Sequence, residues 1–332
     1  MFNNYRPSIE LNSDTVINPS DTLKILGISF GNHRHKHKLN FTPHINNIVN
    51  KTQKICNILF AIIGNTWGIN TRKRINLYKG LIRPSVLYGH QIWYKHITVK
   101  LNNKLNSVQH QILIKAICAY RTTSCNIVCI ICNTEKLTDY IDSSLITKNI
   151  QDRSLRKLAM NIRKKHCINT YFNNVNNNFA SFFPSHAIPK FFSPNFYNMQ
   201  FLSGHGNFGC YLYRMNLTAS PQCECGYENQ NPIHILLHCS FFNFNSNGFI
   251  NPDDFFINRN SYKVFNNICL NYYNLKHNWI FNTIIIIITI IVICIFVFFY
   301  FSFISLFCDF YNYDVIYHLY LSYNYLIRDI VR

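Results

Sequence analysis

Apolar residues recur at helical spacing over three stretches of the first 120 residues. Thr42 is placed to cap the first helix, and Pro43 suits the first turn of this helix. The apolar face of the first helix is formed by Ile45, Ile48, Val49, Ile55, Cys56, Leu59, Phe60 and Ile63. A second helix begins near Thr71 and meets a break or kink at Pro84, with Ile75, Tyr78, Leu81 and Ile82 on one side. A third runs from about Leu101 to Ala119. We expect these helices to form an antiparallel bundle over residues 22–137, opened by one short strand at 22–30.

The pattern changes after the bundle. Periodicity fades over residues 138–199, which we expect to be an irregular linker. Residues 200–245 hold a compact cysteine- and histidine-containing unit, and 246–279 form a second linker. Residues 280–308 carry no charge and exceed the roughly 20 apolar residues that cross a bilayer as a helix. The predicted fold is therefore mainly α, with one membrane-length helix followed by a tail at 309–332.

Charge points to a polyanionic partner. The chain has 332 residues and a net charge of +18, and no Asp or Glu occurs between Asp21 and Glu135. Lys and Arg release counterions from phosphates, so an RNA or DNA duplex is the expected partner, whereas a merely solvated basic face is the alternative. The predicted phosphate contacts are Lys51, Lys54, Arg72, Lys73, Arg74, Lys79 and Arg83.

The cysteines favour metal binding over disulfides. All 13 are scattered, and residues 1–21 lack the apolar core of a secretory signal, so a reduced compartment is implied. The spacing Cys-x-Cys-x8-His-x4-Cys predicts a structural Zn²⁺ site, with free thiols as the alternative and His238 as a reserve ligand; its residues are Cys223, Cys225, His234 and Cys239. A second group, interleaved with Ile and Val, is expected to be core instead: Cys125, Cys129 and Cys132.

Two motif sets resemble one family. The first comprises Ile25-Leu26-Gly27-Ile28-Ser29-Phe30, Phe41-Thr42-Pro43-His44-Ile45, Leu77 to Pro84 and Leu87-Tyr88-Gly89, followed by Val108 to Gln111 and Ala119 to Ser124. The second is Gly204-His205-Gly206 with Tyr211-Leu212 and the four cysteine and histidine positions. They resemble, respectively, the thumb and the cysteine-containing tail of non-LTR retrotransposon reverse transcriptases.

The resemblance implies a thumb that grips a primer–template duplex, and it also implies what is missing. Family polymerases carry metal-binding carboxylates in a palm upstream, so residues 1–21 resemble only the end of a palm. No carboxylate lies between Asp152 and Glu224, so a ribonuclease H region is also expected to be absent. We therefore expect a non-catalytic remnant of an RNA-directed DNA polymerase protein that binds nucleic acid.

Two alternatives remain open. One is a protein anchored in the membrane through residues 280–308, because Arg259, Lys263 and Lys276 precede this segment and favour a cytosolic basic part. The other is an accessory part of a polymerase completed by another chain. Localisation follows the choice: membrane if 280–308 inserts, and otherwise nuclear or cytoplasmic.

Overall fold

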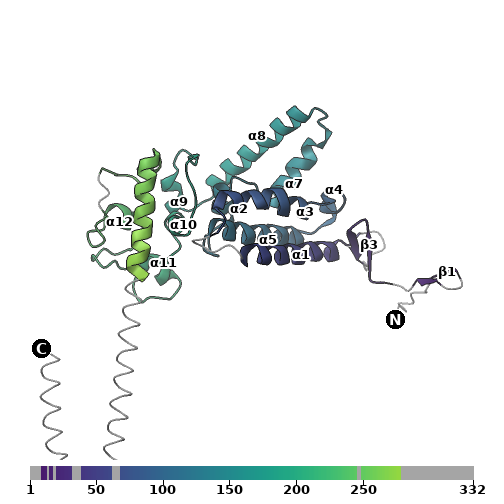
Figure 1. Ribbon diagram of the computed structural model, residues 1–332, viewed down its shortest axis with the longest axis horizontal. Coiled ribbons are helices and arrows are strands. Elements are labelled where there is room, and N and C mark those ends of the chain that lie inside the picture. The colour runs from purple at the N-terminus through teal and green to yellow at the C-terminus, as the bar shows by residue number, and fades with distance from the viewer. Residues whose placement is uncertain are drawn as a thin grey trace, which may run out of the picture. The chain divides into compact units, whose positions relative to one another are not determined.

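The computed structural model describes residues 9–12, 15–17, 20–31, 39–61, 68–244 and 248–277. Residues up to Tyr272 belong to one compact unit, and the chain from Tyr273 belongs to a second. The described part is mainly helical, as expected (Figure 1).

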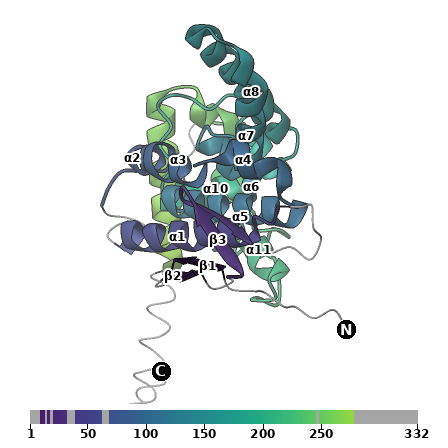
Figure 2. The same ribbon diagram turned by 90° about the vertical axis from the view of Figure 1, so that its right-hand side faces the viewer.

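Two small hairpins precede the helices. Strands β1 (Ile9–Asn12) and β2 (Thr15–Ile17) pair antiparallel, and so do β3 (Thr22–Ile25) and β4 (Ile28–Gly31). The single strand predicted over 22–30 is thus a hairpin, whose turn at Leu26 and Gly27 has positive φ at both residues. Such a turn matches the twist of paired strands, which is why a Gly in mid-pattern reverses the chain. The β3 hairpin lies beside one end of the bundle (Figures 1 and 2).

Three helical stretches form the bundle: α1 (Thr42–Ala61), the run α2 (Thr71–Leu77), η1 (Tyr78–Ile82) and α3 (Arg83–Val86), and α5 (Val99–Ile117). Side-chain bonds from Lys104 to Asn46 and from Lys115 to Asn57 show that α1 and α5 run parallel. The run from α2 to α3 is antiparallel to α5, since Arg74 meets Cys118 just after the end of α5, whereas Tyr78, further along the run, meets Gln109 in the middle of α5. Helices adjacent in sequence therefore alternate in direction.

Pro84 shapes the middle stretch without ending it. The turn before it, Tyr78–Ile82, is a π-helix, which accommodates the carbonyl that a proline leaves without a donor. The predicted inward face is correct for Ile75, Tyr78 and Ile82, but Leu81 is 53% exposed. Helix α4 (His90–Trp93) and η2 (Tyr94–His96) follow.

The segment predicted to be an irregular linker is helical, so that prediction was wrong. It contains most of α7 (Leu137–Ile146), η3 (Thr147–Asn149), α8 (Arg153–Phe172) and α9 (Asn177–Phe182), and the first half of α10 (Phe196–Ser203). The polar residues that suggested loops are caps: Asp152, Asn176 and Asn195 accept backbone N–H groups at three helix starts.

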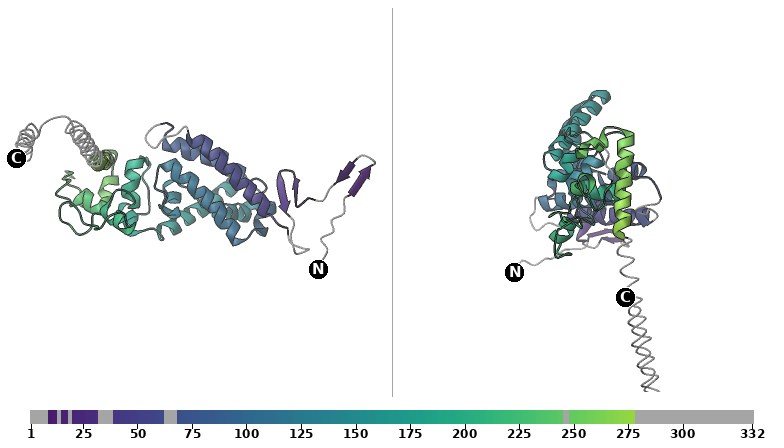
Figure 3. Two further views of the ribbon diagram at one scale, coloured as in Figure 1. Left: turned by 90° about the horizontal axis from the view of Figure 1, so that it is seen from below. Right: turned by 90° about the vertical axis from the view of Figure 1, so that its left-hand side faces the viewer.

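The remaining described elements are α6 (Cys125–Ile131), α11 (Gly209–Arg214), α12 (Pro232–Leu237), η4 (Pro252–Phe256) and a helix over residues 259–277. This last helix is continuous in Figure 3 up to the end of the described chain. One contiguous core joins the bundle to residues 171–272 and includes Cys129 and Cys132, as expected for these thiols; Cys125 packs against it.

The predicted membrane-length helix is corrected. No helix of the described part is both long and apolar enough to cross a bilayer. The physical reason is composition: α5 and α8 carry Lys or Arg along their length, and α1 combines two Lys with four Asn. Residues 280–308, to which the prediction referred, lie outside the described residues.

Candidate metal centre and basic surface

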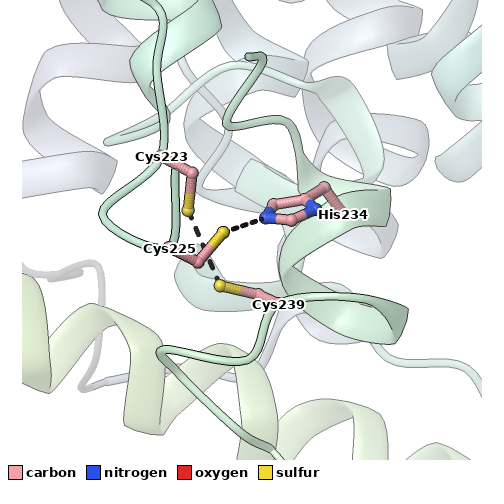
Figure 4. Close-up of side chains that lie close together, drawn as sticks. All are labelled: Cys223, Cys225, His234 and Cys239. Carbon is pink, nitrogen blue, oxygen red and sulfur yellow. Dashed lines mark hydrogen bonds between the residues drawn. The ribbon is translucent and has the colours of Figure 1, made fainter. Parts of the chain in front are cut away.

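The four predicted ligands lie together. The reactive atoms of Cys223, Cys225, His234 and Cys239 are all within 4.8 Å of one another (Figure 4). The Cys223 and Cys239 sulfurs are 3.6 Å apart, and the Cys225 sulfur is 3.2 Å from His234 Nε2. Among the described residues this is the one cluster of three or more such side chains with metal-binding spacing.

Local structure places each ligand. Cys223 and Cys225 sit in a tight turn, in which the Gly226 N–H donates to Cys223 O at 2.9 Å and Gly226 has a φ of +90°. A side chain is strained at such a φ, so glycine suits the position. Asn231 caps α12 by accepting the His234 N–H at 2.9 Å, which puts His234 in the first turn. Cys239 follows directly after the helix ends.

A backbone hydrogen bond favours the thiolate of Cys225, whereas burial disfavours that of Cys223. The Tyr227 N–H lies against the Cys225 sulfur and lowers the pKa of that thiol. Burial raises the pKa of Cys223 to about 12, whereas the N–H of Cys225 and the Gln230 side chain act in the opposite direction. A bound cation would stabilise the negative charge of this buried sulfur, because thiols that coordinate a metal ion lose their protons.

The imidazole is oriented by its surroundings. His234 stacks on Tyr227 with ring centroids 4.3 Å apart, and burial lowers its pKa, so the ring is held neutral as a ligand requires. Its Nδ1 is buried and meets no hydrogen-bond partner within the described chain. His238, the reserve ligand, is exposed and stands outside the cluster. The structure therefore selects His234 between the two.

Gln230, which the sequence did not single out, links the metal centre to the neighbouring helix. It is 2% exposed, its Nε2 donates to Cys223 Sγ at 3.7 Å, and its Oε1 accepts the Gly209 N–H at 2.8 Å. A Cβ at Gly209 would lie 2.9 Å from Pro221 O, so α11 can begin there only with glycine. Its position between Cys225 and His234 is the one sequence signal that could have revealed it.

The seven predicted phosphate contacts fall into two groups. Lys51, Lys54, Arg72 and Lys73 are exposed. Arg74 is 6% exposed, with Nε donating to Ile69 O at 2.5 Å and Nη1 to Cys118 Sγ at 2.9 Å. A buried guanidinium bonded to the protein in this way is not available to a phosphate.

Lys79 and Arg83 also have partners inside the protein. Lys79 Nζ donates to the carbonyls of Cys132 and Asn133 at 2.8 and 3.1 Å, where α6 ends, and burial lowers its pKa to about 8. The Arg83 guanidinium lies 4.2 Å from the centre of the Tyr140 ring. Periodicity could not separate these two residues from their exposed neighbours, because their partners come from later helices.

The Gly204-His205-Gly206 motif joins two parts of the fold. His205 Nδ1 lies 3.0 Å from Thr122 Oγ1, which is also 2.8 Å from the Tyr211 hydroxyl. Gly206 faces Gln200, whose Oε1 would lie 2.5 Å from an added Cβ. The motif is thus explained by close packing.

Comparison with known proteins identifies relatives. No family model and no solved structure matches the chain. A retrovirus-related Pol polyprotein from a type-1 retrotransposable element R1 of Nasonia vitripennis is 23% identical over 67% of this chain, and a second from the same species is 24% identical over 53%. The corresponding protein of Bradysia coprophila is 22% identical over 72%. The aligned parts span 65%, 50% and 26% of those proteins.

These relatives come from the same class of element that the motifs resemble. The chain is a homologue of the Pol polyproteins of R1 non-LTR retrotransposons.

Proposed function

We propose that this retrotransposon-derived chain binds nucleic acid through phosphate contacts of the exposed cations of its bundle, and that zinc fixes its cysteine-containing part. The observation that carries the first half is a run of more than a hundred residues without a carboxylate, from 22 to 134, folded so that Lys51, Lys54, Arg72 and Lys73 reach solvent. Contacts of this kind give affinity without sequence preference.

Part of this surface is hollowed. A groove beside α1 is lined by Lys24 and Lys51, together with small polar side chains and Tyr88. His44, 4% exposed, also lines it, and its Nε2 has no partner within the described chain. His44 Nδ1 accepts the Ser29 N–H at 3.3 Å, which ties β4 to the start of α1. Two lysines beside an open groove suit an anionic oxygen.

Zinc is the ion that the donor set favours. Three sulfurs and one imidazole are soft and borderline ligands, and a tetrahedral shell with zinc–sulfur bonds of about 2.3 Å places the ligand atoms about 3.8 Å apart. The separations of 3.2 and 3.6 Å lie close to that value, and the limit of 4.8 Å requires only a small contraction. All four positions are filled by protein, so the ion would supply structure, with Gln230 supporting one sulfur.

We further propose that the chain does not itself transfer nucleotides. Polymerases hold two metal ions with paired carboxylates, whereas the bundle has none between Asp21 and Glu135. Primer extension with Mg²⁺ or Mn²⁺ tests this, and nucleotide incorporation by the purified chain would contradict it.

Binding is tested on the full chain with a fluorescent RNA–DNA duplex. The variant Lys51→Gln, Lys54→Gln, Lys73→Gln removes three proposed contacts, and the matched control Lys95→Gln, Lys100→Gln, Lys148→Gln removes three exposed charges outside the proposed contacts. Each lost contact lowers the slope of log affinity against log salt by about 0.7–0.9. We expect a decrease of roughly 2–3 for the first variant and little change for the control. Equal slopes for all three proteins would refute the proposed contacts.

A further inference from the structure

A second group of cations lies away from the groove beside α1. Arg72, Lys190, Arg259 and Lys263 line one open hollow with Phe191 and Tyr262, and none of its lining residues is acidic. All four cations are exposed. We call this hollow the four-cation groove. Its members come from three segments far apart in sequence, only one of which belongs to the bundle.

Specific bonds hold the three segments together. Thr71 Oγ1 donates to Pro194 O at 2.7 Å, and Arg72 Nη2 donates to Lys190 O at 3.2 Å. On the other side, the Tyr262 hydroxyl accepts the Ser193 N–H at 3.1 Å. Residues 190–194 are thus tied both to the start of α2 and to the helix over 259–277. The cations are gathered by the fold and are not a chance grouping of flexible side chains.

Helix electrostatics argue against a purely structural role for two of these cations. Arg259 is the first residue of its helix and Lys263 lies one turn later, while Asn258 caps the helix by accepting the N–H groups of Asn260 and Ser261, each at 2.9 Å. Cations near a helix N-terminus oppose the helix dipole and reduce stability. An anion bound between these cations would be attracted by both the side chains and the dipole.

We infer that the four-cation groove binds the phosphate backbone of the same nucleic acid that the bundle contacts, so that the binding surface continues past α2 onto residues 190 and 259–263. This inference rests on the proposed function, since the bundle and the groove share Arg72. Its chemistry is that of phosphate oxygens held by ammonium and guanidinium groups. A nucleic-acid backbone is favoured over an isolated anion because four separate cations along an open hollow match a row of phosphates.

The test compares the full-length wild type with Lys190→Gln, Arg259→Gln, Lys263→Gln. If each residue meets one phosphate, the salt slope falls by about 2.7, so that between about 50 and about 200 mM salt the wild type loses roughly 40-fold more affinity than the variant. The matched control is again Lys95→Gln, Lys100→Gln, Lys148→Gln, for which we expect wild-type behaviour. Single variants Lys190→Gln and Lys263→Gln, each expected to give roughly a 3.5-fold effect, serve if the triple variant does not fold.

The other outcomes each overturn the inference in a distinct way. If the groove variant behaves like the control while the Lys51, Lys54, Lys73 variant loses slope, the groove is not part of the binding surface and the proposed function stands. If the groove variant loses only binding to phosphatidylserine vesicles, the ligand is a lipid. If inorganic phosphate displaces the duplex at equal phosphate concentration, the groove holds isolated anions. If the wild type binds no duplex, the proposed function fails as well.

Discussion

Neighbouring residues Lys73 and Arg74 should respond oppositely to the same substitution. Sequence alone gives them one role, but Lys73 is exposed and Arg74 is 6% exposed with bonds to Ile69 O and Cys118 Sγ. Replacing each by Met removes one positive charge and keeps an unbranched apolar stem. The main difference between the two variants is therefore that the lost charge was exposed in one and buried in the other.

The expected magnitudes follow from these contacts. A hydrogen bond from a charged group contributes about 1.5–3 kcal/mol, and part of the cost is recovered because Met needs no buried charge. We expect Arg74→Met to lower the free energy of unfolding by roughly 2–4 kcal/mol, whereas an exposed substitution such as Lys73→Met changes it by about 0.5 kcal/mol or less. The melting temperature should fall by roughly 3–7 °C for Arg74→Met, because the unfolding entropy grows with the size of the unit.

Two assays separate the variants. Urea unfolding followed by circular dichroism, at fixed zinc concentration, should show destabilisation for Arg74→Met alone. Duplex binding of the folded proteins should show a salt slope lower by about 0.9 for Lys73→Met alone. Reversed results, with Arg74→Met stable but weak in binding, would refute the assignment of the buried guanidinium to the core.

Three further substitutions test other parts of the account. His234→Ala should abolish stoichiometric zinc by metal analysis, whereas His238→Ala, one helical turn away and exposed, should retain it; retention by both would exclude His234 as a ligand. The pKa of Lys79 is lowered from 10.5 to about 8, so between pH 8 and pH 10.5 the unfolded chain binds more protons than the folded one. The stability of the wild type should therefore rise with pH over this range relative to that of Lys79→Met. If the urea midpoints of the two proteins change equally with pH, the burial of this amine is contradicted. Gly89→Ala should destabilise by roughly 1–3 kcal/mol in urea, because φ is +64° and the new Cβ would lie 2.7 Å from Ile28 Cδ1; an unchanged midpoint would show that this turn tolerates a side chain.

Sequence reasoning succeeded where a short-range signal sufficed. The helices at 42–61 and 99–117 follow apolar spacing, and the close approach of the four Cys and His side chains follows from a spacing of a few residues. It also predicted that Pro84 disturbs the second helix, although the disturbance is a π-helical turn before the proline and the helix does not break.

It failed where long-range partners decide the structure. Residues 138–199 lack a clear periodicity, yet Asn198 among them is fully buried and donates to Ser193 O and to the Tyr262 hydroxyl. The roles of Arg74 and Lys79 likewise depend on carbonyls and a sulfur supplied from elsewhere in the chain. Polar residues that satisfy buried groups have the same composition as polar residues in solvent, so no local pattern distinguishes them.

The most direct test of nucleic-acid binding is the affinity of the full-length chain for RNA–DNA duplexes of two unrelated sequences, measured across a series of salt concentrations. The account predicts that log affinity falls linearly with log salt, with the same slope and nearly equal affinities for both sequences. An affinity that does not change with salt, or that belongs to one sequence only, would contradict it.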